Sequence, residues 1–147
     1  MVVTDSTADG SAQGPWLVDK SALVKLAASP NHALWIDRAG RGLIHVAAVT
    51  VLEVGYSVRS AAEHAHLTTR PPLSTLPVEY SSPAIEQRAL AIQGLLAQRG
   101  QHRAPSVADL IIAATADLHG LTVLHHDKDF ELIAEVTGQR QTRLGMT

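Results

Sequence analysis

The stretch SVADLIIAATADLHGLTVL, residues 106–124, predicts a helix followed by a buried strand, the repeating unit of an α/β fold. Its first part predicts a helix over residues 106–119, because five apolar side chains recur at helical spacing and form one stripe: Val107, Leu110, Ile111, Ala114 and Leu118. Gly120 is a natural C-terminal stop for this helix. Residues 121–124 then form a short apolar run that predicts a buried strand.

Helices and strands continue to alternate on both sides of this stretch. Apolar runs predict strands at residues 16–18, 43–46 and 78–80, and a last edge strand at residues 141–144. Helical spacing and capping residues predict the remaining helices, over residues 22–26, 31–40, 50–65, 83–99 and 127–136. Three prolines mark residues 67–77 as a loop that would flank a site. Strands alternating with helices imply a parallel sheet covered on both faces.

The composition predicts one globular domain over residues 15–147, because 46% of the 147 residues are hydrophobic and 18% are charged. Residues 1–14 are small and polar, which predicts a disordered tail.

The lack of cysteine excludes disulfides, thiolate metal sites and cysteine nucleophiles, and it suits a cytoplasmic protein. No apolar run approaches the ~20 residues of a membrane helix, so we expect no membrane partner. A net charge of −2 and few aromatic residues disfavour nonspecific coating of nucleic acid and single-strand binding by stacking.

Four acidic residues stand at the end of an apolar run or at the start of a helix: Asp19, Glu53, Asp109 and Asp127. In an α/β fold such positions collect at one edge of the sheet, where ligands bind. Helix capping explains each acid alone equally well. Glu53 and Asp109 stand three residues after Thr50 and Ser106, the spacing of a capping box. Asp127 is a good N-cap, and Asp19 suits a turn. Only their joint placement favours a metal site.

Carboxylates gathered at this edge would hold a divalent cation. Each helix N-terminus carries about half a positive charge, which offsets the repulsion among the acids and helps to keep them ionised. Oxygen ligands without any thiolate favour Mg²⁺, with Mn²⁺ as a substitute, over zinc. Without metal, the same repulsion would raise one or more carboxyl pKa values.

The residues around these acids resemble a known family. The resemblance runs from about Trp16 to the C-terminus and rests on four motifs in family order: Val18-Asp19-x-Ser21-Ala22, Thr50-x-x-Glu53-Val54, Ala108-Asp109-Leu110-Ile111-Ile112-Ala113-Ala114-Thr115-Ala116 and Asp127-Lys128-Asp129-Phe130. These motifs resemble the PIN-domain ribonucleases, and in particular the VapC-type toxins of toxin–antitoxin pairs. The resemblance implies a three-layer α/β/α fold with a mainly parallel central sheet of four to five strands.

The resemblance also implies a reaction and a set of site residues. The expected activity is Mg²⁺-dependent cleavage of RNA by an activated water, which leaves a 5′-phosphate and a 3′-hydroxyl. Asp19, Glu53, Asp109 and Asp127 match the acidic quartet of the family. We expect the three aspartates to bind metal directly, and Glu53 to bind through water or to act as a general base. Asp129 is a candidate fifth acid and metal ligand.

Three further residues are of interest near these acids. Ser21 would hydrogen-bond an acid or a metal-bound water, or cap the first helix. Arg103 precedes Asp109 at the same edge and would meet a substrate phosphate, or else lie on the surface in solvent. His125 departs from the family, which commonly has threonine or serine two residues before the fourth acid.

Partners follow from the resemblance alone. It implies an RNA substrate, a cognate VapB-like antitoxin that often inserts a basic side chain into the acidic site, and a homodimer. The apolar helices over residues 50–65 and 84–99 would supply such surfaces, although burial in the core explains them equally well.

Two other functions are compatible with acids at strand ends. One is a phosphate-accepting signalling domain of the receiver type, but this chain lacks an acidic pair after the first strand and Lys128 is poorly placed as the distal lysine. The other is a binding-only domain that keeps the acids as helix caps.

Overall fold

The computed structural model describes residues 14–146, so the tail predicted for residues 1–14 lies outside the described residues except for Gly14. The strands are β1 Trp16–Val18, β2 Ile44–Ala47, β3 Val78–Glu79, β4 Thr122–His125 and β5 Gln141–Arg143. The helices are α2 Lys20–Lys25, α3 His32–Gly40, α4 Ala48–Tyr56, α5 Ala61–Thr69, α6 Pro83–Gln98, α7 Val107–His119 and α8 Lys128–Thr137. Two short 3₁₀ turns, Leu26–Ala28 and Leu73–Thr75, complete the described elements.

The five strands form one sheet in the order β3-β2-β1-β4-β5, and all four pairings are parallel. The predicted parallel sheet is therefore confirmed. The central strand β1 places Leu17 opposite His45 on one side and opposite Val123 on the other. Because all strands run the same way, the ends of β1, β2 and β4 lie at one edge, where α2, α4 and the loop before α8 begin.

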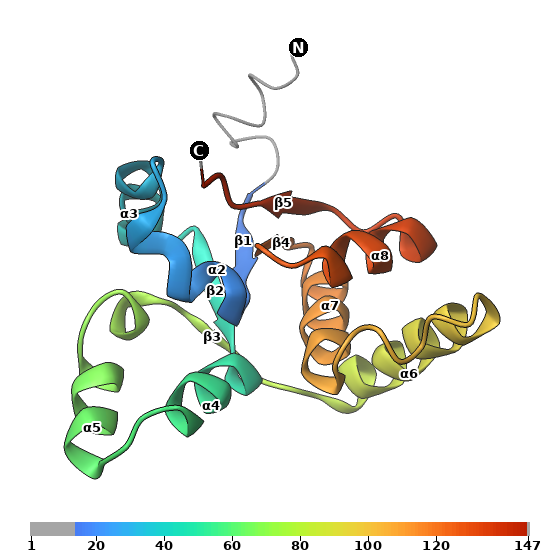
Figure 1. The fold of residues 1–147 in the computed structure, drawn as a ribbon, viewed down its shortest axis with the longest axis horizontal. Coiled ribbons are helices and arrows are strands. Elements are labelled where there is room, and N and C mark those ends of the chain that lie inside the picture. Colours follow the sequence, from blue (N-terminus) through green and yellow to red (C-terminus); the bar gives the residue numbers. More distant parts are fainter. Residues whose placement is uncertain (1–13, 147) are drawn as a thin grey trace.

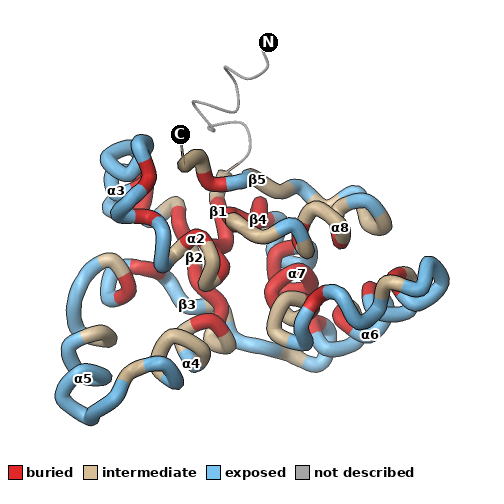
Figure 2. Tube along the Cα trace, viewed as in Figure 1, coloured by how far each residue is buried: buried red, intermediate tan, exposed pale blue. Residues whose placement is uncertain are grey.

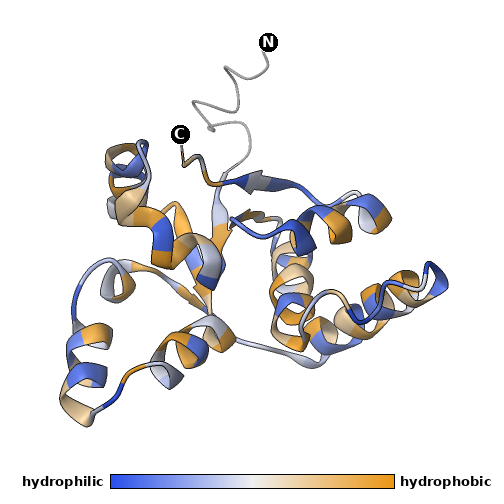
Figure 3. Cartoon of the chain, in the orientation of Figure 1, coloured by the Kyte–Doolittle hydropathy of each residue, from blue (hydrophilic) through white to orange (hydrophobic). Residues whose placement is uncertain are grey.

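Two hydrophobic cores lie on opposite faces of the sheet. Leu17 and Val123 face the core formed with α6, α7 and α8, whereas Trp16, Val18 and Leu124 face the core formed with α2 and α3. Figure 1 shows these helix groups on either side of the strands, which confirms the predicted three-layer α/β/α fold. Strands β1, β2 and β4 and helix α7 are the most deeply buried elements in Figure 2. In Figure 3 the long helices carry both hydrophobic and hydrophilic residues.

Residues 106–124 form the predicted helix and strand, α7 and β4. Ser106 caps α7, and Gly120 ends it in a left-handed conformation with φ of 67°. The strand that follows, β4, is buried along its whole length. Within residues 14–146 no helix is long and apolar enough to cross a membrane.

The helix predicted over residues 50–65 is wrong, because the chain forms two helices there, α4 and α5. Ser60 starts the second helix, since its side chain accepts a hydrogen bond from the Glu63 N–H at 3.1 Å. The Glu63 carboxylate accepts in turn from the N–H of Arg59 at 2.8 Å. These two bonds fix a new helix start, which the Ser60-x-x-Glu63 spacing would have indicated.

Candidate metal centre

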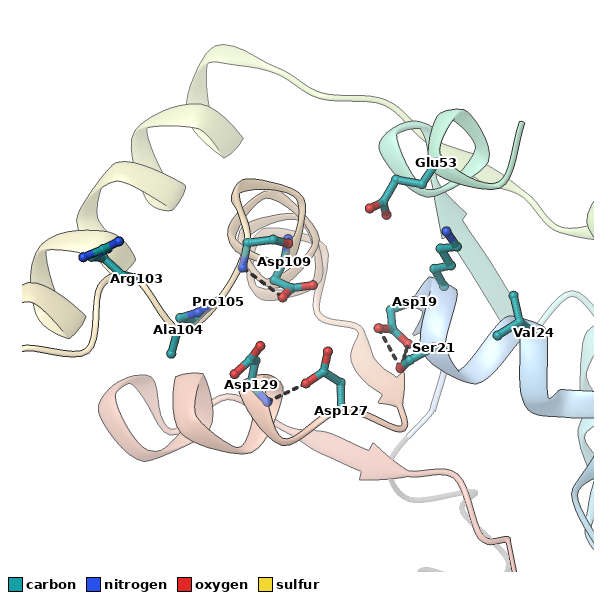
Figure 4. A pocket seen from close by; sticks show the side chains of 12 residues that line it. Asp19, Ser21, Val24, Glu53, Arg103, Ala104, Pro105, Asp109, Asp127 and Asp129 are labelled. Carbon is teal, nitrogen blue, oxygen red and sulfur yellow. Dashed lines mark hydrogen bonds between the residues drawn. The ribbon is translucent and has the colours of Figure 1, made fainter. Parts of the chain in front are cut away.

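A cavity of about 540 Å³ opens at the carboxyl edge of the sheet, where β1 and β4 end. All seven site residues predicted from the sequence line it: Asp19, Ser21, Glu53, Arg103, Asp109, Asp127 and Asp129. Figure 4 shows the five acidic side chains around one common space, with Arg103 at its rim. The predicted loop over residues 67–77 contributes no side chain to this cavity.

Asp19 follows β1 directly and is 3% exposed. Its N–H donates to the Leu124 carbonyl at 3.0 Å, which ties the residue to β4. Its carboxylate caps α2 by accepting from the Ala22 N–H at 3.0 Å. Burial raises the pKa of Asp19, and the hydrogen bonds from Ala22 and Ser21 oppose that rise.

Ser21 connects this acid to the loop on the other side of the cavity. Its hydroxyl lies 2.8 and 2.9 Å from the two carboxylate oxygens of Asp19 and donates to them. The same oxygen accepts from the N–H of His126 at 2.8 Å. One hydroxyl therefore fixes the distance between the end of β1 and the loop that leads to Asp127.

Asp109 stands in the first turn of α7 and forms the predicted capping box. Its N–H donates to the Ser106 hydroxyl at 3.1 Å, and its Oδ2 accepts from the Ser106 N–H at 3.1 Å. Burial raises the pKa of Asp109 to about 6, and the negative charges of Asp127 and Asp19 add to the rise. Hydrogen bonds from Ser106 oppose it.

Asp127 is the N-cap of α8, as predicted, and accepts from the Asp129 N–H at 2.9 Å. The pKa of the Asp129 carboxyl is raised by burial and by the neighbouring charge of Asp127. Carboxylate oxygens of Asp109, Asp127 and Asp129 all lie within 4.8 Å of one another. This spacing suits a single divalent cation bound by oxygen ligands.

Glu53 reaches the cavity from α4, but the predicted capping box with Thr50 is wrong. The helix begins at Ala48 with Ala47 in the N-cap position, so Thr50 already lies inside the helix and is fully buried. Glu53 therefore stands in the second turn, half-buried and facing the acids.

Sequence reasoning missed three apolar residues of the cavity wall, namely Val24, Ala104 and Pro105. In the sequence, only their position close to Ser21 or Ser106 indicated that they would lie near the site. Lys20 also lines the cavity, and its ammonium donates to the Ser57 hydroxyl at 3.3 Å.

Comparison with known proteins identifies the family. The PIN domain family model matches residues 16–136. The chain is 57% identical over 129 residues to Ribonuclease VapC2 of Mycobacterium tuberculosis. The alignment covers 88% of this chain and 92% of that relative.

Solved structures agree with this fold. The VapBC2 complex from Rickettsia felis, bound to a DNA fragment from its promoter, has a chain that matches with a TM-score of 0.72 at 16% identity, covering 87% of this chain and 97% of that one. A toxin–antitoxin complex from Klebsiella pneumoniae matches with a TM-score of 0.56 at 26% identity, covering 77% and 87%. The match along most of the chain gives the receiver-type alternative no support. The chain thus belongs to the PIN-domain family, among the VapC-type ribonucleases.

Proposed function

We propose that this protein is a Mg²⁺-dependent endoribonuclease that acts as the toxin of a toxin–antitoxin pair. One observation carries the proposal: five carboxylates surround a single cavity in a chain that is 57% identical to Ribonuclease VapC2. Mn²⁺ would substitute for Mg²⁺, because both cations prefer oxygen ligands. The single domain proposed for residues 15–147 would contain the whole site.

Asp109, Asp127 and Asp129 would hold the cation, since their oxygens already lie within 4.8 Å of one another. Asp19 would complete the ligand set from the end of β1. A divalent cation at this point supplies positive charge that stabilises a phosphoryl transition state and makes water more acidic. The raised pKa values of Asp19, Asp109 and Asp129 support this assignment, because burial makes their ionised forms unfavourable and the charge of Asp127 adds to this effect at Asp109 and Asp129. A bound cation would relieve both effects.

The remaining side chains of the cavity would orient the RNA and move the proton. Glu53 stands apart from the three close aspartates and would accept the proton of the attacking water. Arg103, at the rim, would bind a phosphate of the RNA backbone. Ser21 would keep the Asp19 carboxylate turned toward the cavity through its hydroxyl.

An RNA cleavage assay with the purified protein tests the proposal. We expect cleavage with Mg²⁺, none in EDTA, and loss of cleavage in Asp19→Asn and Asp109→Asn. Asp117→Asn is the matched control, because Asp117 lies on the same helix as Asp109 and pairs with Arg88 instead of lining the cavity. Full activity in EDTA, or in both site variants, would overturn the proposal.

A VapB-like antitoxin would occupy the groove beside the cavity. Leu23, Val54, Leu67 and Leu73 line this groove of about 240 Å³, and Val24 lines both the groove and the acidic cavity. An apolar antitoxin segment seated there would reach the acids with one basic side chain. Val24→Asp should abolish co-purification with the product of the adjacent gene, whereas Ile36→Asp, an exposed apolar residue on α3, should not. Equal retention by both variants would refute this placement.

A homodimer would form through the exposed apolar residues of α6 and α7. Leu90 is 68% exposed and Val107 74% exposed, beside a hollow of about 270 Å³ between the two helices. Light scattering should report a dimer for the natural chain and a monomer for Leu90→Glu. A monomeric natural chain would contradict this assignment.

The toxin would act in the cytoplasm, where cellular RNA is available.

A further inference from the structure

His125 occupies an unusual position for a histidine, at the end of β4 directly before the loop that carries Asp127. The residue is fully buried, with 0% of its surface exposed. Its ring lies 5.4 Å from the ring of Phe130, which is also fully buried in α8. The backbone at His125 is held as well, because its carbonyl accepts from the N–H of Leu144.

Both ring nitrogens have a partner. The N–H of Asp127 donates to Nδ1 at 3.1 Å, so Nδ1 carries no proton in this arrangement. The proton must then lie on Nε2, which is within hydrogen-bond distance of Oε1 of Gln141, on β5. The two bonds select one tautomer and one orientation of the ring, because rotating the ring or moving its proton would break both.

We propose that His125 and Gln141 form a positioning pair that holds Asp127 at the metal centre. Nδ1 closes a two-residue turn by accepting from the Asp127 N–H, as a short side chain oxygen does in an Asx or ST turn. Gln141 keeps Nδ1 in the acceptor state by binding the opposite nitrogen. The edge strand β5 thereby acts on Asp127 through the imidazole of His125. The inference rests on the proposed function, because it concerns how a metal ligand is placed.

The proposal distinguishes between substitutions at position 125. His125→Ala removes the acceptor for the Asp127 N–H and leaves the loop free to choose other conformations. His125→Asn restores the acceptor, because its Oδ1 stands where Nδ1 stood and makes an Asx turn. Gln141→Leu leaves the imidazole in place but removes the partner that selects its tautomer. Arg143→Gln is the control. Arg143 is the register partner of His125 in the sheet, and its substitution breaks a 3.0 Å ion pair between β5 and Glu131 of α8 while it leaves both ring hydrogen bonds of His125 in place.

Mn²⁺ titration by calorimetry is the first readout. We expect His125→Ala to weaken binding about 10-fold, Gln141→Leu to weaken it by a smaller factor, and His125→Asn and Arg143→Gln to stay within about 3-fold of the natural chain. In RNA cleavage, kcat should fall with His125→Ala while KM changes little, since Arg103 and the rim are untouched. Melting temperatures measured by circular dichroism show whether a variant binds Mn²⁺ weakly only because it is less stable. Across the four variants, the loss of Mn²⁺ affinity should not correlate with the drop in melting temperature.

The ¹⁵N spectrum of His125 is the second readout and needs no metal. It should show an unprotonated Nδ1 and a protonated Nε2 in the natural chain, and a mixture of tautomers in Gln141→Leu. A protonated Nδ1, or equal Mn²⁺ affinity in His125→Ala and the natural chain, would overturn the inference. If the natural chain itself binds no Mn²⁺, the proposed function fails, and the tautomer measurement still decides whether the pair exists.

Discussion

Replacing Asp109 by asparagine should stabilise the metal-free protein while it removes a metal ligand. The burial and the neighbouring charges that raise its pKa to about 6 make the ionised form unfavourable in the folded state. Asparagine has no charge, and its Oδ1 can still accept from the Ser106 N–H, so the capping box survives.

The magnitude follows from the pKa. A rise from 3.8 to about 6 corresponds to about 3 kcal/mol at neutral pH, since one pKa unit is about 1.4 kcal/mol. Asp109 is only half-buried, so solvent screening reduces the expected gain to about 1–2 kcal/mol. For a chain of this length, that gain raises the melting temperature by about 3–6 °C.

The sign of the pH dependence is fixed. The folded state holds the Asp109 proton more tightly than the unfolded chain, so the penalty is complete above about pH 6 to 7 and disappears as the pH falls below 3.8. The stability advantage of Asp109→Asn in EDTA should therefore be largest at pH 8 and fall to about a third or less at pH 4.

Thermal melts of both proteins in EDTA at pH 8 and pH 4 provide the assay, and excess Mn²⁺ at pH 8 should reverse the order by stabilising only the natural chain. A variant that melts below the natural chain at pH 8, or an advantage of equal size at both pH values, would refute this reasoning.

Three other perturbations have defined outcomes. Ser21→Ala removes the hydroxyl that donates to Asp19, so the Mn²⁺ affinity measured by calorimetry should fall about 10-fold. Recovery of the affinity in Ser21→Thr would show that the loss comes from the missing hydrogen bond and not from changed packing. Mn²⁺ affinity should also fall as the pH drops below about 6, because protons then compete with the metal for the Asp109 carboxylate. An affinity that stays constant from pH 7.5 to pH 5 would contradict the assignment of Asp109 as a ligand. Gly120→Ala should lower the free energy of unfolding by about 1 kcal/mol in denaturant titrations, because the φ of 67° is unfavourable for alanine although no atom obstructs its Cβ. Gly94→Ala, inside α6, should be neutral or stabilising, and equal effects of the two substitutions would contradict this reason.

The sequence predicted best those features that depend on near neighbours. The helix α7 and its end at Gly120 were recognisable because apolar spacing, a capping serine and a terminal glycine all lie within one short stretch. Asp109 and Asp127 were recognisable for the same reason, since Asp109 completes the capping box of α7 and Asp127 is the N-cap of α8. The clustering of the acids followed from the parallel sheet, which brings the ends of its strands to one edge.

Features that depend on distant segments were not predictable in the same way. The hydroxyl of Ser21 meets the N–H of His126, 105 residues away, and no local pattern indicates that contact. His125 was recognisable as a departure from the family, but its role required Gln141, 16 residues further on, to be placed beside it.

The division between α4 and α5 was missed for a different reason. Thr50-x-x-Glu53 and Ser60-x-x-Glu63 have the same spacing, yet Thr50 lies inside α4 whereas Ser60 is the N-cap of α5. Spacing alone does not distinguish these two positions.

The most direct test of the metal centre is an anomalous diffraction measurement on crystals soaked in Mn²⁺. We expect a strong peak within bonding distance of carboxylate oxygens of Asp109, Asp127 and Asp129, and no such peak in Asp109→Asn crystals treated in the same way. An empty cavity in crystals of the natural chain, with the acids accessible to solvent, would contradict a metal centre at these residues.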